Sequence, residues 1–401
     1  MREDPRMRIA VVGGGPGGLF FAVFARLARP DWQVTVWERD SAQSSGFGLV
    51  LPRRALETLR QRDPDLSHRL DSRMVWWENV LIRHNGGSVS IAGPPYSSIS
   101  RALLLSELRV RCQELQVQIR TGQAAPDSPE LARTHELVVA ADGANSLVRS
   151  AHQRSFGSTP KVGRSRYAWL CMGEQLDAFQ FYTLERSGNV IQIHSYPHAT
   201  DASTVIIEMR EEAWRRLSLA SDGTDAFGES SVQFCQQILT DAFGKVPLLA
   251  HSRSWRRFVS VSAESWTTRN VVLMGDAAHA MHFSTGSGTK LAMDDALVLV
   301  DCLAGEAGIE SALQAYQNRR YPTVSEFARA AEASRVWFEE IDAYRDKHIS
   351  EFALSLLIRS GRISAERLRW AGMQALRDTD EPGFRRARVE LGVFAEPRRI
   401  S

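Results

Sequence analysis

The chain has 401 residues, of which 43% are hydrophobic and 24% charged, with a net charge of +2 at pH 7. This balance predicts a globular protein with a substantial core and argues against a nucleic-acid partner. Four widely spaced cysteines without a C-x-x-C pair argue against a disulfide scaffold or a zinc site and favour the reducing cytoplasm, and no apolar run has the length of a membrane span.

A strand, a glycine-rich turn and a helix are predicted at the start of the chain. The β-branched run 8–12 predicts a buried parallel strand, and the apolar pattern of 19–29 predicts a helix. The turn between them matches G-x-G-x-x-G at Gly13, Gly15 and Gly18. In this pattern the first glycine permits a tight turn, the second lets a pyrophosphate approach the backbone, and the third lets the helix pack on the strand.

A second strand is predicted over 32–38, and it ends in Glu38, twenty residues beyond Gly18. An acid at this place suits a ribose 2′-hydroxyl and disfavours a 2′-phosphate. The unit therefore predicts a dinucleotide site. NAD dehydrogenases also have such a turn, so the turn alone leaves the cofactor open.

Two later segments place an aspartate after a predicted strand. Asp142 follows the strand in 135–151, and Asp276 follows the strand in 269–303. The carboxyl end of a strand faces the ligand crevice of an α/β sheet, so Asp276 could accept hydrogen bonds from polyol hydroxyls. The alternative is an aspartate that only caps the next helix or turn.

A glycine loop follows Asp276 and leads into a predicted helix. The loop contains Gly286 and Gly288, and the helix is expected to begin near Thr289. Such a helix start would offer N–H groups and a partial positive charge to an anionic ring edge. Lys290 either adds charge there or is a solvated helix lysine.

Taken in order, the glycine turn, the ADG-x-x-S-x-x-R segment (141–149) and GDAAH (275–279) resemble the single-component flavin-dependent aromatic hydroxylases of the p-hydroxybenzoate hydroxylase class. The resemblance implies an α/β fold with a discontinuous Rossmann-like FAD-binding domain, a mixed β-sheet substrate domain and C-terminal helices. We assign the FAD-binding domain to 7–72, 96–156 and 265–335, the substrate domain to 75–95 and 160–260, and the C-terminal helical segment to 336–401.

The same resemblance implies FAD at the glycine turn, with Glu38 on the adenosine ribose, Arg101 near the FAD backbone and Asp276 on the ribityl chain. It also implies NADH or NADPH as co-substrate and ring hydroxylation through a C4a-hydroperoxyflavin. The expected cofactor-binding residues are Gly13, Gly15, Gly18, Glu38, Arg39, Gly48, Arg101, Asp142, Asp276, Gly286, Gly288 and Thr289.

The segment 282–296 departs from the commonest pattern, with Phe283 in place of proline and Lys290 in place of asparagine. It resembles the subfamily of salicylyl-CoA 5-hydroxylase and the monooxygenase part of 2-aminobenzoyl-CoA monooxygenase/reductase, near the violacein-pathway tryptophan hydroxylase. Segments 177–216 and 334–369 are similar to the same group. This implies a 2-hydroxy- or 2-aminobenzoyl thioester of CoA or a carrier protein, hydroxylated at C5. The alternatives are a free aromatic or indole substrate, or a flavin oxidase or reductase without oxygen insertion.

Two histidines and Lys290 are the candidate catalytic residues. His282, in the glycine loop, could exchange a proton with the substrate near neutral pH, or it could be structural. His194 alternates with Gln192 and Tyr196 on a predicted strand. These three side chains either line the roof of the active site or form the polar outer face of a sheet.

The last part of the chain is predicted to be helical. Residues 311–369 are expected to form helices broken near Pro322 and Gly361, and the apolar stripe of 351–360 is expected to be core. The basic segments 384–388 and 397–401 are expected to form a solvated tail.

Overall fold

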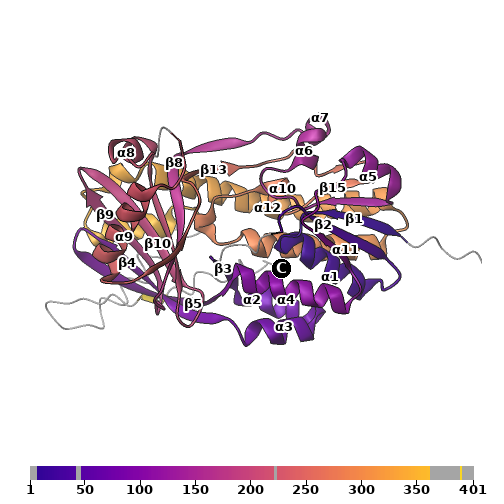
Figure 1. Ribbon diagram of the computed structural model, residues 1–401, viewed down its shortest axis with the longest axis horizontal. Coiled ribbons are helices and arrows are strands. Elements are labelled where there is room, and N and C mark those ends of the chain that lie inside the picture. Colours follow the sequence, from indigo (N-terminus) through magenta and orange to yellow (C-terminus); the bar gives the residue numbers. More distant parts are fainter. Residues whose placement is uncertain (1–6, 42–46, 221–223, 362–388, 391–401) are drawn as a thin grey trace, which may run out of the picture.

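The computed structural model describes residues 7–41, 47–220, 224–361 and 389–390. Its helices and strands gather around two β-sheets at opposite ends of the molecule, and one long helix crosses between them (Figure 1). The α/β fold expected from the sequence is confirmed.

The first sheet has six strands, and its interior strands are parallel. In spatial order the six strands are β14 (Thr267–Thr268), β15 (Val271–Leu273), β7 (Leu137–Ala140), β1 (Arg8–Val12), β2 (Gln33–Glu38) and β6 (Gln118–Thr121). Val12 is in register with Ala140 on one side and with Trp37 on the other. The carboxyl ends of these strands therefore meet at one edge, as the sequence predicts for the ligand crevice.

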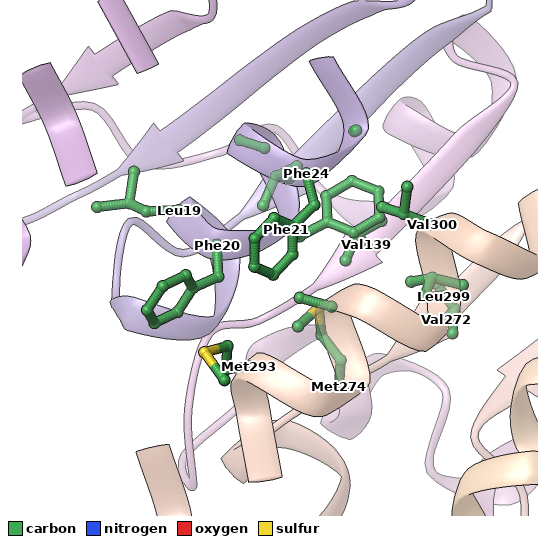
Figure 2. Close-up of a cluster of buried hydrophobic side chains, with 14 of the residues drawn as sticks. Leu19, Phe20, Phe21, Phe24, Val139, Val272, Met274, Met293, Leu299 and Val300 are labelled. Atoms are coloured by element: carbon green, nitrogen blue, oxygen red, sulfur yellow. The ribbon is translucent and has the colours of Figure 1, made fainter. Parts of the chain in front are cut away.

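Three main helices cover this sheet: α1 (Pro16–Ala28), α4 (Arg101–Glu114) and α11 (Gly288–Gly305). The phenylalanine rings of α1, Phe20, Phe21 and Phe24, are buried between the sheet and the side chains of α11 (Figure 2). Shorter elements around them are α2 (Arg53–Arg62), α3 (Pro64–Asp71), α5 (Ser128–Thr134), α6 (Leu147–Ala151), α7 (Gln153–Phe156), α10 (Asp276–His279) and the 3-10 helix η1 (Phe283–Thr285).

The second sheet has ten strands and is mixed, because β4 runs parallel to β9 and β16 runs parallel to β5 while the other pairs are antiparallel. Along the sheet the order is β12 (Leu248–His251), β8 (Lys161–Met172), β11 (Ser203–Arg210), β10 (Asn189–Pro197), β9 (Phe179–Arg186), β4 (Val75–His84), β5 (Gly87–Ser100) and β16 (Val389–Glu390), with β13 (Arg256–Ser260) on β8 and β3 (Gly48–Pro52) on β5. The mixed sheet expected from the sequence is confirmed, and we call it the substrate sheet after the role that the sequence predicts for it.

Helices cover both faces of the second sheet. One face packs against α8 (Glu211–Arg216) and α9 (Glu229–Phe243), and the other against the end of α12 (Ile309–Glu339), the 3-10 helix η2 (Ile341–Tyr344) and α13 (Ile349–Ile358). β3 and the end of β5 pair in this sheet, although both lie in segments that we assigned to the FAD-binding domain. The division into domains stays a prediction.

Helix α12 corrects one expectation. The break predicted near Pro322 is wrong, because the helix runs through that residue without interruption. A proline inside a helix removes one backbone hydrogen bond. Tyr316, Arg320 and Val324 are buried around it, so tertiary packing outweighs that loss. The break expected near Gly361 agrees with the end of α13 at Ile358. The helix expected after it, up to residue 369, and the basic segments 384–388 and 397–401 lie outside the described residues.

A helix with the length and apolar character needed to cross a membrane is absent from the part of the chain that the structure describes.

Candidate cofactor and active site

The three glycines of the N-terminal turn have different surroundings. Gly13 has φ of +110°, and a Cβ there would lie 2.3 Å from the Ala141 carbonyl oxygen. A Cβ on Gly18 would lie 2.1 Å from the Gly13 carbonyl oxygen, so helix and strand meet too closely for any side chain. Gly15 faces open space, and a Cβ there would have no neighbouring atom within 4 Å. Gly13 and Gly18 therefore shape the turn, and Gly15 leaves the face over which a phosphate can approach.

Glu38 lies directly beside this turn. Its Oε2 accepts a hydrogen bond from the Gly14 N–H at 3.0 Å, and its Oε1 accepts one from the Asp40 N–H at 2.9 Å. Arg39 next to it is exposed, with its Nε 3.8 Å from an Asp40 carboxylate oxygen. The Glu38 carboxylate is thus fixed at the edge of the crevice, where a ribose would lie.

Arg101, the first residue of α4, is a largely enclosed cation. Burial lowers the pKa of its guanidinium, while the carboxylates of Glu38 and Asp276 favour the charged form. Within the described residues its side chain has no hydrogen-bond partner. A guanidinium in that state suits an anionic ligand, because its donors are free for a phosphate.

Asp276 is the first residue of α10, after Gly275 in a left-handed conformation with φ of +57°. Its side chain is accessible to solvent, but protein atoms surround the carboxylate on several sides. This partial desolvation raises its pKa. One Asp276 oxygen lies 3.9 Å from the position of a Cβ on Gly288, so it stands opposite the start of α11. Among the described residues it caps no helix, which argues against the capping alternative.

Asp142 has a structural role on one of its two oxygens. Its Oδ2 accepts from the N–H groups of the first two residues of α6, Leu147 at 2.8 Å and Val148 at 3.3 Å. Its Oδ1 is buried without a hydrogen-bond partner among the described atoms. A buried acceptor in this state is unusual and can receive a hydrogen bond from a ligand at the crevice.

The glycine loop places Gly286 against β3 and starts α11 at Gly288, followed by Thr289. Gly286 is left-handed with φ of +59°. Lys290 pairs along the helix with Asp294, Nζ to Oδ2 at 2.6 Å. Gly48 of β3 donates its N–H to Thr204 Oγ1 at 2.6 Å, so it is tied to the substrate sheet.

These residues fit FAD. The open face at Gly15, the Glu38 carboxylate and the partnerless Arg101 suit an adenosine diphosphate, and the accessible Asp276 suits a polyol. The N–H groups at the start of α11 suit an anionic ring edge.

The candidate histidines are brought together by a residue that sequence patterns did not single out. His194 Nε2 lies 3.2 Å from Glu208 Oε2, and His282 Nε2 lies 3.7 Å from Glu208 Oε1. All three side chains are buried, as are Gln192 and Tyr196, so the alternative of a polar outer face is wrong. The available signal was a single acid inside the β-branched strand STVIIEMR.

Five aromatic rings gather between the substrate sheet and η1, and sequence patterns missed most of them. The ring of Phe283 lies 5.1 Å from Tyr167 and 6.1 Å from Trp169, and Trp169 lies 5.9 Å from Phe47. Phe258 completes the group at 6.1 Å from Phe283. We call these five residues the ring cluster. All are partly exposed, so they can receive a planar aromatic group by offset or edge contacts.

Comparison with known proteins agrees with this geometry. A sequence profile of the FAD binding domain family matches residues 127–331. Salicyloyl-CoA 5-hydroxylase of a Streptomyces species is 34% identical over 363 residues, 88% of this chain and 70% of that protein. The 3-hydroxy-4-methyl-anthranilyl-(aryl-carrier protein) 5-monooxygenase of Streptosporangium sibiricum is 33% identical over 371 residues, 92% of this chain and 99% of that protein.

Among solved structures, the tetrameric form of 2-methyl-3-hydroxypyridine-5-carboxylic acid oxygenase has the same fold, with a TM-score of 0.68 and 21% identity over 90% of this chain and 98% of that one. The profile spans half of the chain, and two relatives match most of its length. The chain therefore belongs to the FAD-dependent aromatic monooxygenases.

Proposed function

We propose that the enzyme hydroxylates a 2-hydroxy- or 2-aminobenzoyl thioester of CoA or a carrier protein at C5. The observation that carries this proposal is the charge around the ring cluster. His194 and His282 pack against Phe283, and the buried Glu208 carboxylate lies between the two histidines. A free benzoate would bring a second negative charge beside Glu208, whereas a thioester is neutral.

The names of two relatives support the same substrate class, since one acts on salicyloyl-CoA and the other on an anthranilyl group bound to a carrier protein. The ring chemistry supports the position. A hydroxyl or amino group directs an electrophilic oxygen para to itself, and the neighbouring carbonyl directs it meta. C5 satisfies both preferences.

We propose that FAD is held by the residues selected from the sequence: Gly13, Gly15, Gly18, Glu38, Arg39, Gly48, Arg101, Asp142, Asp276, Gly286, Gly288 and Thr289. When bound and reduced, FAD supplies the activation of dioxygen and the transfer of one oxygen atom to the ring. The start of α11 would stabilise negative charge on the nearby edge of the flavin. Lys290 would add to this field, although Asp294 partly offsets its charge.

The protein's own part is to hold the ring, exclude water and move protons. The ring cluster would hold the substrate ring, and its apolar surface would keep water away from the reacting atoms. His194 and His282 are the proposed proton-transfer residues. NADH or NADPH is the proposed electron donor. The four cysteines are buried thiols, which suits the cytoplasm as the place of reaction.

A substrate panel tests the proposal. NADH and NADPH oxidation would be measured with free salicylate, anthranilate and tryptophan and with the matching aryl thioesters, and the product mass would be recorded. We expect a mass gain of one oxygen and the highest kcat/KM with a thioester. If a free acid or tryptophan is hydroxylated with a higher kcat/KM than every thioester, the substrate proposal is wrong and the enzyme acts on a free aromatic.

A further inference from the structure

A network of polar side chains links the end of α13 to the substrate sheet. Arg359 Nε lies 2.8 Å from Ser334 Oγ, which lies 2.8 Å from Ser284 Oγ, which in turn lies 2.8 Å from His282 Nδ1. His194 Nε2 is within hydrogen-bond distance of Glu208, at 3.2 Å, and His282 Nε2 faces the other carboxylate oxygen at 3.7 Å. Five separate elements or loops supply these six residues, and the path passes through the glycine loop in front of α11.

The ionised Glu208 carboxylate sets the direction of the hydrogen bonds in this network when both imidazoles are neutral. A carboxylate can only accept, so His194 and His282 each carry their one proton on Nε2, toward Glu208. The Nδ1 of His282 is then a lone pair that accepts from the Ser284 hydroxyl. Because Ser284 has a single proton to donate, Ser334 donates to Ser284 and accepts from the Arg359 guanidinium.

The two ends of this network are charged groups, the buried Glu208 and the partly buried Arg359, that do not pair directly with each other. Burial by itself would raise the pKa of Glu208, but the two imidazoles hold it down at about 2, so the carboxylate stays ionised. Burial lowers the pKa of His194, and it lowers that of Arg359 to about 10. A buried carboxylate is unfavourable unless it is hydrogen-bonded, which makes Glu208 a costly residue to keep for packing alone.

One acceptor of this network, the Nδ1 of His194, has no partner within the described part of the chain. With the proton on Nε2, the Nδ1 of His194 is a lone pair, and among the described residues it makes no hydrogen bond. The His194 ring lies 5.6 Å from Phe283 of the ring cluster.

We infer that Glu208 is a positioning residue that holds both imidazoles with their protons on Nε2, so that His194 Nδ1 receives the proton that the substrate ring loses. This rests on the proposed function. After oxygen has been added at C5, the C5–H bond breaks, its electron pair restores the aromatic ring, and its proton moves to His194 Nδ1. Glu208 balances the charge of the resulting imidazolium.

The tautomers can be measured without any substrate. Holoenzyme labelled with ¹⁵N in histidine would be studied by NMR at pH 8, with the signals of His194 and His282 assigned from the variants His194→Gln and His282→Gln. We expect a protonated Nε2 and an unprotonated Nδ1 in both rings of the wild-type enzyme. A proton on Nδ1 of either ring would overturn the inference, and this result does not depend on the fate of any Glu208 variant.

Kinetics of Glu208→Gln test the catalytic consequence. We expect FAD content and KM to stay within about twofold of wild type and kcat to fall about ten- to hundredfold. In a plot of kcat against pH, the fall in kcat on the acid side (the acid limb) should move to lower pH. The reason is that the pKa of His194 falls when the carboxylate that stabilises its cation is gone. His282, Arg359 and Tyr167 are the other titratable groups close enough to interact electrostatically with His194 and Glu208. Burial raises the pKa of Tyr167.

Two variants serve as controls. Glu208→Asp keeps the charge and is expected to return the acid limb toward its wild-type position. Glu211→Gln removes a carboxylate that pairs with Arg166 and Arg215 near the end of the same strand, and it should leave kcat and the limb unchanged. A Glu208→Gln enzyme with wild-type kcat and an unmoved limb would overturn the inference.

The proposed function and this inference fail separately. If the tautomers are as expected but a free acid is the best substrate, only the substrate proposal is wrong, and the Glu208 variants are then measured with that acid. If a thioester is the best substrate but either imidazole has its proton on Nδ1, only the role of Glu208 is wrong.

Discussion

Arg149 donates a hydrogen bond of 2.8 Å to the carbonyl oxygen of Ala277 and another of 2.5 Å to the carbonyl oxygen of Ala144. It thereby joins the segment after β7 to the GDAAH segment after β15. Its side chain is buried, and burial lowers the pKa of the guanidinium, with the charge of Asp142 acting against this effect. Two motifs that are far apart in sequence are thus held as one rigid edge of the cofactor crevice.

Arg149→Met should destabilise the folded protein. The variant keeps most of the side-chain volume but leaves two carbonyl oxygens without their charged donor, which costs about 2–3 kcal/mol. Thermal unfolding of the apoprotein measures the effect. Arg154→Met, an exposed arginine on the neighbouring helix α7, is the matched control and should leave the melting temperature unchanged. Equal melting temperatures for both variants would contradict this role of Arg149.

Gly15→Val should abolish FAD binding without unfolding the protein. The space beside Gly15 is open, and its backbone has φ of −76°, which valine adopts easily. The new side chain would instead occupy the path of the pyrophosphate. The flavin absorbance of the purified protein and its far-UV circular dichroism measure binding and folding separately.

Gly18→Val is the matched contrast, because its side chain would collide with the Gly13 backbone. We expect this variant to lose the folded state itself, so flavin and circular dichroism signals should fall together. A folded Gly15→Val protein that retains FAD would show that the open face is not the phosphate site.

The residues that sequence alone predicts are those whose constraint is local. Gly13 and Gly275 have a positive φ, and Gly18 meets the carbonyl of Gly13 five residues before it, so these requirements of the backbone leave a motif. Glu208 has no motif, because its partners come from β10 and from the loop before η1, and only the folded sheet brings them together. The wrong break at Pro322 has the same cause, since burial of Tyr316 and Val324 overrides a local propensity.

Asp276→Ala should weaken FAD binding but not the apoprotein. Bound FAD would cover this accessible carboxylate, so loss of the acceptor would leave ligand hydroxyls unpaired and cost about 1–3 kcal/mol, or roughly ten- to hundredfold in affinity. In the apoprotein the carboxylate accepts no hydrogen bond from the described residues, and partial desolvation by the surrounding protein raises its pKa, so its removal should leave the melting temperature equal or slightly higher. Fluorescence titration with FAD and apoprotein melting give the two values.

Asp301→Ala removes a carboxylate on α11 that pairs with Arg62 at the surface, and it should keep wild-type FAD affinity. If Asp276→Ala retains FAD as tightly as this control, the ribityl assignment is wrong.

Acidification should destabilise the protein in two steps. Burial lowers the pKa of His84 and His194 in the folded state, so below the ordinary histidine value of about 6.5 the unfolded chain binds protons that the folded protein excludes, and stability falls as pH falls. Asp295 and Glu208, with pKa values of about 2, are still ionised when an unfolded carboxyl group takes up its proton near pH 4, so a second loss begins there. Melting temperatures of the apoprotein from pH 8 to pH 4 at constant ionic strength measure both steps, and a higher melting temperature at pH 5 than at pH 8 would contradict the sign.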